Sequence, residues 1–65
     1  MNKEKISKWF LDNFKVHTDW TGSYVETQFK CNSVKDVIDK FIRDNLPFIA
    51  KYYDEYDIWQ VIAVL

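Results

Sequence analysis

The last eight residues of the chain constrain its fold most strongly. Segment 58–65 has the sequence Ile-Trp-Gln-Val-Ile-Ala-Val-Leu, which is apolar at every position except Gln60. Its β-branched residues fit a pleated strand, and a strand covered on one side only would alternate apolar and polar residues. The segment is therefore predicted to be a strand whose two faces both need apolar cover.

The length and composition are those of a small domain with a large aromatic content. The chain has 65 residues and carries three Trp, five Phe and four Tyr, which can supply a core despite the short chain. Its single cysteine cannot form an internal disulfide. The net charge of −1 disfavours a disordered tail and a nucleic-acid-binding surface. We expect one compact domain, residues 1–65, stabilised without a covalent cross-link.

The N-terminal residues and the amino-acid composition suggest where the protein acts. Residues 1–5 lack the apolar run of a secretory signal, and no stretch has the length of a membrane span. We therefore expect a cytoplasmic protein with no membrane partner. Lys, Asn, Ile, Phe, Tyr and Asp dominate, which is typical of AT-rich genes. This bias suggests a low-GC bacterium or its phage, and in the latter case the host cytoplasm.

Two helices are predicted from apolar spacing. Residues 3–14 place Ile6, Trp9, Phe10 and Phe14 on one face, and Asn2 can cap the start. Residues from 33 onward form a second stripe that comprises Val34, Val37, Ile38, Phe41, Ile42 and Leu46. Ser33 resembles the first residue of a capping box, and Asp36–Lys40 and Asp39–Arg43 have the spacing of helix ion pairs.

A hairpin is predicted between these helices. Gly22 is the only glycine and can adopt the positive φ of a tight turn centred on Thr21-Gly22. That turn pairs Thr18 with Val25 and Val16 with Thr27 on one face, and His17 with Glu26 on the other. Apolar and polar residues then separate onto different faces, which favours this pairing.

The remaining segment completes the expected fold. Pro47 should end the second helix, and Phe48, Ile49, Tyr52, Tyr53 and Tyr56 have a spacing that predicts a short helix over about 47–55. The predicted fold is α+β: helix, hairpin, helix, short helix and C-terminal strand (αββααβ), with a three-stranded sheet and helices packed on it. Because a tight turn makes the hairpin strands neighbours, the C-terminal strand must be an edge.

An apolar edge strand predicts contact with another chain. Segment 58–65 has no Lys, Pro or inward charge that would discourage edge pairing. One resolution is that helices of the same chain cover both faces. The other is a homodimer through the C-terminal strand region, or another protein bound there.

The sequence gives little indication of catalysis or metal binding. His17 and Cys31 are the sole residues of their types and fall on opposite faces of the predicted hairpin, which disfavours a nucleophile pair. No ligand-spaced cluster fits zinc, segment 54–57 lacks the pattern of a calcium loop, and no glycine-rich loop could hold phosphate. We expect a protein that is not an enzyme and has no metal or cofactor.

The predicted element order resembles that of type II KH domains, which bind RNA. That family carries a Gly-x-x-Gly loop between its consecutive helices. Residues 43–48, Arg-Asp-Asn-Leu-Pro-Phe, contain no glycine and no basic cluster at the corresponding place. The resemblance implies an alternative function, a nucleic-acid-binding module that uses sheet aromatics such as Trp20 and Tyr24, although the net charge offers little attraction to phosphate.

A run of aromatic and acidic residues is the candidate partner-binding site. Tyrosine and tryptophan are enriched at interaction hot spots, and acidic residues attract a basic partner. The predicted site residues are Tyr52, Tyr53, Asp54, Glu55, Tyr56, Asp57 and Trp59. Alternatively, Tyr52, Tyr56 and Trp59 belong to the core and the acids to a solvated turn.

These observations lead to a functional hypothesis. We expect a small non-catalytic protein–protein interaction module, and specifically a phage or mobile-element inhibitor that binds and blocks a bacterial nucleic-acid enzyme or defence protein. A purely structural homodimer subunit is a further alternative. The sequence does not identify the partner.

Overall fold

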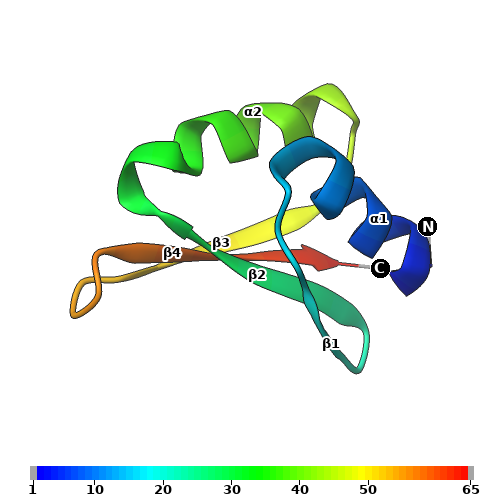
Figure 1. The fold of residues 1–65 in the computed structure, drawn as a ribbon, viewed down its shortest axis with the longest axis horizontal. Coiled ribbons are helices and arrows are strands. Elements are labelled where there is room, and N and C mark those ends of the chain that lie inside the picture. The colour runs from blue at the N-terminus through cyan, green and yellow to red at the C-terminus, as the bar shows by residue number, and fades with distance from the viewer. Residues whose placement is uncertain (1, 65) are drawn as a thin grey trace.

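The computed structural model describes residues 2–64, so Met1 and Leu65 of the predicted segments lie outside it. Within that range the fold is α+β, with two α-helices, one 3₁₀ turn and four strands (Figure 1). In chain order the elements are α1 (Lys3–Phe14), β1 (Asp19–Thr21), β2 (Tyr24–Lys30), η1 (Cys31–Ser33), α2 (Val34–Arg43), β3 (Phe48–Tyr53) and β4 (Ile58–Val64).

The four strands form one antiparallel sheet in the order β1-β2-β4-β3. The C-terminal strand, β4, is therefore a central strand, hydrogen-bonded to β2 on one side and to β3 on the other. The prediction of a three-stranded sheet with an edge strand at the C-terminus is wrong. A strand missing from the prediction, β3, occupies the edge instead and satisfies the second edge of β4.

The predicted short helix over 47–55 is also wrong, because most of that segment is β3. In the strand, Phe48 and Tyr52 lie on the face that carries the helices, while Ile49 and Tyr53 lie on the opposite face. A strand with large apolar residues on both faces gives a spacing that also fits a helix. Pairing with Ile58 to Ala63 of β4 stabilises the extended form.

The predicted hairpin exists, but its turn lies one residue later along the chain. Thr21 pairs with Tyr24, so Gly22 and Ser23 form the turn, and Gly22 has the positive φ of 51° that favours glycine. Asp19, not His17, is opposite Glu26. The observed pairing differs from the predicted one by two residues, and a shift of two leaves each side chain on its predicted face.

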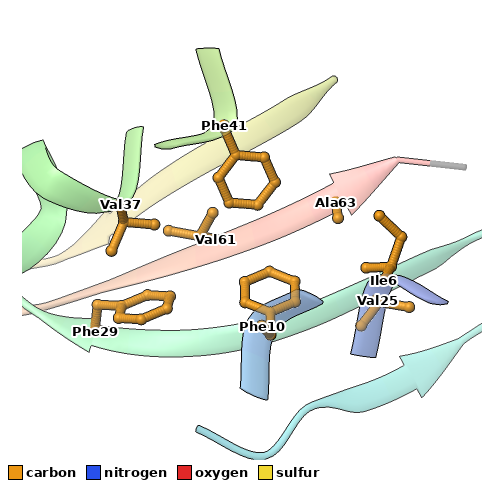
Figure 2. Close-up of a cluster of buried hydrophobic side chains, with 8 residues drawn as sticks. All are labelled: Ile6, Phe10, Val25, Phe29, Val37, Phe41, Val61 and Ala63. Carbon is orange, nitrogen blue, oxygen red and sulfur yellow. The ribbon is translucent and has the colours of Figure 1, made fainter. Parts of the chain in front are cut away.

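Both helices pack on the same face of the sheet, as Figure 1 shows. The core lies between these layers and consists of Ile6, Phe10, Val25, Phe29, Val37, Phe41, Val61 and Ala63 (Figure 2). Phe10 of α1 and Phe41 of α2 are fully buried, with ring centroids 5.5 Å apart in an edge-to-face arrangement. Aromatic packing between the two helices therefore forms the centre of the core.

Helix α1 confirms its predicted bounds and its cap. The Asn2 side chain accepts a hydrogen bond of 2.9 Å from the backbone N–H of Lys5. At the other end, Lys15 adopts a left-handed conformation, and its N–H donates to the carbonyl of Leu11. This geometry turns the chain sharply out of the helix and toward β1.

Helix α2 differs from its prediction in three details. Ser33 makes no side-chain cap, because the 3₁₀ turn η1 leads directly into the helix. Lys40 and Arg43 do not form the predicted pairs but donate to Asn13, and Arg43 also pairs with Asp44 at 2.7 Å. Ile42, assigned to the buried stripe, is 65% exposed.

Candidate protein-interaction surface

The seven predicted site residues come together at the end of the β3–β4 hairpin. Tyr52 and Tyr53 end β3, residues 54–57 form the connecting turn, and Trp59 is the second residue of β4. We call residues 54–57 the tip. Asp57 has a positive φ of 52°, which lets the chain return into β4 directly after it.

Tyr52, Trp59 and Asp57 form one group on the helix-bearing side of the sheet. Tyr52 and Trp59 are cross-strand partners with ring centroids 5.3 Å apart. The Tyr52 hydroxyl donates to Oδ1 of Asp57 at 2.8 Å. This hydrogen bond, followed by desolvation, raises the pKa of Tyr52 to about 12. The group fixes the tip against the end of the sheet.

Tyr53 lies on the opposite face and belongs to a separate polar chain. Its hydroxyl donates to Oε1 of Gln60 at 3.0 Å, and Nε2 of Gln60 donates to Glu26 at 2.6 Å. The ammonium of Lys51 lies 5.0 Å from the centre of the Tyr53 ring. Tyr53 is half-buried and has a structural role in the sheet, so it does not share a surface with Tyr52.

The tip itself is the most exposed part of the predicted site. Tyr56 is 69% exposed, and Asp54, Glu55 and Asp57 are exposed around it. Tyr56 and Asp57 also line an open hollow together with residues 30–32 and Ile58. A large ring held in solvent among three carboxylates can contact a partner without any rearrangement of the core.

Trp59 belongs to the packing of the domain and not to an exposed site. The residue is half-buried, and its indole N–H is buried without a hydrogen-bond partner within residues 2–64. The predicted residues therefore divide into an exposed tip, a supporting pair formed by Tyr52 and Trp59, and Tyr53 on the other face.

Sequence reasoning missed two apolar surfaces. On the sheet face opposite the helices, Ile49 and Ile62 are cross-strand partners, and Ile49 is 55% exposed. The second surface is Ile42 on α2. The apolar residues on both faces of 58–65 predicted cover on the second face as well. The two helices leave that face open in residues 2–64 (Figure 1).

The alternative chemistry is not assembled within the described residues. His17 precedes β1, and Glu26 is paired with Asp19 and Gln60, so the predicted His17–Glu26 contact is wrong. Cys31 is exposed in η1, directly after the end of β2. Trp20 is opposite Val25 and donates to Ser7 of α1, whereas Tyr24 lies on the other face. These two rings do not form one stacking platform.

Within residues 2–64, no group of three His, Cys, Asp or Glu side chains is placed to hold a metal ion. None of the helices in the same range has the length and apolar character needed to cross a membrane. Comparisons with protein-family models, curated proteins and solved structures gave no match.

Proposed function

We propose that this protein is a non-catalytic interaction module that binds a partner protein with the tip of its β3–β4 hairpin. The observation that carries the proposal is the exposure of Tyr56, at 69%, among three carboxylates. A tyrosine buries a large area on binding and loses little side-chain entropy. A ring of this kind, set on a short turn between two paired strands, presents a partner with a preorganised contact.

The charge of the tip indicates the class of partner. Asp54, Glu55 and Asp57 place three negative charges in four residues, and such a field attracts a basic protein surface. Enzymes and defence proteins that handle nucleic acids present basic surfaces to phosphate. An inhibitor that occupies such a surface is the role that we propose, with a phage or mobile element as the source suggested by the amino-acid composition.

The test is capture of a binding partner from a bacterial lysate, followed by measurement of its affinity for purified variants. Tyr56→Ala and Asp54→Lys should each weaken binding by roughly tenfold or more, because they remove the ring and reverse a charge at the contact. Asp12→Lys is the matched control, since it makes the same charge change at an exposed position of α1.

Two results would contradict the proposal. Equal affinity of the two tip variants and wild type would place the site elsewhere. Binding to nucleic acid that falls steeply with salt and is unaffected by Tyr56→Ala would favour the nucleic-acid module instead. Circular dichroism should give the same spectrum for every variant, which separates loss of contact from loss of fold.

A further inference from the structure

The outer edge of β3 is the longest unpaired strand edge in the described sheet. β3 lies at one end of the strand order and has six residues, whereas β1 at the other end has three. Pro47 precedes β3, and no proline interrupts it. An edge of this length without a bulge or proline offers its backbone groups to another strand.

The backbone groups that this edge offers can be assigned from the pairing with β4. Hydrogen-bonded and non-hydrogen-bonded pairs alternate along an antiparallel ladder. The N–H of Val64 donates to the carbonyl of Pro47 at 3.2 Å, which makes Pro47–Val64 a hydrogen-bonded pair. Counting from it, Phe48, Ala50 and Tyr52 direct their N–H and C=O groups away from β4, to the unpaired side.

Isoleucines flank this edge on both sides of the sheet; Ile42 and Ile49 are exposed and Ile38 is half-buried. Ile49, 55% exposed, lies beside it on the open face. On the helix-bearing side, Ile38 and Ile42 occupy the side of α2 turned away from Lys40 and Arg43, which contact α1. Since α1 packs over β1 and β2, this side of α2 faces the β3 edge (Figure 1). The edge is therefore bordered by apolar surface above and below.

We propose that a second copy of this chain pairs with β3 through a two-fold axis at Ala50. In this register Ala50 faces Ala50 of the other copy, and Phe48 faces Tyr52 in both directions. The three residues that direct their backbone groups outward are then all hydrogen-bonded, and the two sheets join into one of eight strands. The α2 helices of the two copies meet above the junction through Ile38 and Ile42.

Charge disfavours the neighbouring register centred on Lys51. Lys51 is the only charged residue of β3, and pairing about Ala50 places it opposite Ile49 of the other copy. A shift that moves the axis to Lys51 would place the two lysines directly opposite one another, which is destabilising. With the axis at Lys51, Phe48 would also lie beyond the end of the other β3, so fewer of the outward-directed residues would be hydrogen-bonded.

Such a dimer needs a small share of the surface that the chain exposes. A stable interface buries about 800 Å² on each partner, which is under a fifth of the 4529 Å² that the chain exposes. A strand edge with apolar residues on both sides is the kind of surface that supplies this area. The dimer would leave Tyr56 free and direct the two tips to opposite ends of the joined sheet, so the inference is independent of the proposed function.

The first test is the solution mass of the full chain across a wide concentration series, by sedimentation equilibrium. Wild type should give twice the 7.9 kDa mass of one chain. Ile42→Lys, at an exposed position, and Ala50→Pro, which removes an outward-directed N–H, should each weaken dimerisation by roughly tenfold or more. Tyr56→Ala is the control and should leave the mass unchanged. A wild-type monomer at millimolar concentration, or a dimer insensitive to Ile42→Lys, would overturn the proposal.

The second test fixes the register by disulfide cross-linking in a Cys31→Ser background. Paired residues in a hydrogen-bonded position have Cα atoms about 5.5 Å apart, which a disulfide can bridge. Ala50→Cys should therefore cross-link the dimer on mild oxidation. Ile49→Cys, which faces Lys51 of the other copy, should not cross-link at a comparable rate. Efficient cross-linking by Ile49→Cys but not by Ala50→Cys would contradict the two-fold axis at Ala50.

Discussion

The indole N–H of Trp9 donates to Oδ2 of Asp44 at 2.6 Å and so joins α1 to the C-cap residue of α2. Arg43 binds the same carboxylate through Nε at 2.9 Å and a terminal nitrogen at 2.7 Å. The Arg43 hydrogen bonds, and then that of Trp9, lower the pKa of Asp44 to about 2. The ionised carboxylate therefore connects the two helices.

Asp44 should make the stability of the fold depend on pH in the acidic range. A carboxyl whose folded pKa lies below its ordinary value of 3.8 stabilises the fold above that value, and the contribution is lost as pH falls toward 2. Asp44→Asn should therefore lower Tm at pH 5 but not at pH 2. Thermal melts between pH 2 and pH 5 measure the difference in Tm between wild type and Asp44→Asn, with Asp12→Asn as the control. A difference that stays constant with pH would contradict the role of the Asp44 charge.

Tyr52 should ionise later than an ordinary tyrosine. Its raised pKa, about 12, means that the Tyr52–Asp57 contact stabilises the fold below pH 10 and that this contribution is lost as pH rises through 12. Asp57→Asn should move the ionisation of Tyr52 back toward pH 10, while asparagine tolerates the positive φ at this position. Absorbance titration follows the ionisation of the tyrosines with pH. The ionisation step near pH 12 belongs to Tyr52 if Tyr52→Phe removes it. A late step unchanged in Asp57→Asn would exclude Asp57 as its cause.

The end of α1 should gain stability from a glycine. Lys15 has φ of 57° and ψ of 36°, a conformation that costs a non-glycine residue roughly 1 kcal/mol. Lys15→Gly should therefore raise the free energy of unfolding by about 0.5–1 kcal/mol after the greater freedom of the unfolded chain is counted. Lys15→Ala removes the same side chain but keeps Cβ, so it should give no gain. Urea denaturation compares them, and equal stability of the two variants would contradict the argument.

The sequence allowed the first helix, the hairpin and the apolar stripe of α2 to be predicted because each has an unambiguous local signal. Asn2 precedes a helical spacing, and Gly22 marks the turn. The two-residue error in the hairpin register did not change the faces, since the pleat repeats every two residues. Long-range pairing decided the register, and a single local segment does not contain that information.

One wrong segment accounts for most of the remaining differences. Phe48, Ile49, Tyr52 and Tyr53 satisfy a helical spacing and a two-faced strand equally well. Assigning the helix removed β3, and without β3 the C-terminal strand became an edge. The six-residue length, the aromatic content and the following turn would have favoured a strand. The same error placed Tyr52 and Tyr53 on one surface, whereas neighbours in a strand face opposite ways.

The exposure of Ile42 could not be predicted from the helix alone. Ile42 continues the apolar stripe of α2, but the sheet under that part of the helix ends at β3. Only the width of the sheet decides how much of an apolar stripe is covered. The position of the sheet edge is therefore needed before an apolar helix residue can be assigned to the core or to an interface.

The two tyrosine hydroxyls of the hairpin should differ in their effect on stability. Tyr53→Phe removes the donor to Gln60, which then keeps only its contact with Glu26. The loss should cost about 1 kcal/mol, since a half-buried acceptor is left unpaired. Tyr56→Phe is the matched control and should change the unfolding free energy by less than about 0.5 kcal/mol, because Tyr56 is exposed.

Urea denaturation of both variants would separate structural from binding residues at the hairpin. Gln60 is the one polar residue of segment 58–65, and the Tyr53 hydroxyl and Glu26 satisfy its two ends on the open face. If Tyr53→Phe were as stable as wild type, the hydrogen bonds that join Tyr53, Gln60 and Glu26 would not stabilise the sheet. Tyr53 would then return to the set of candidate contact residues. A loss confined to Tyr53→Phe would leave Tyr56 as the hairpin tyrosine free to serve a partner.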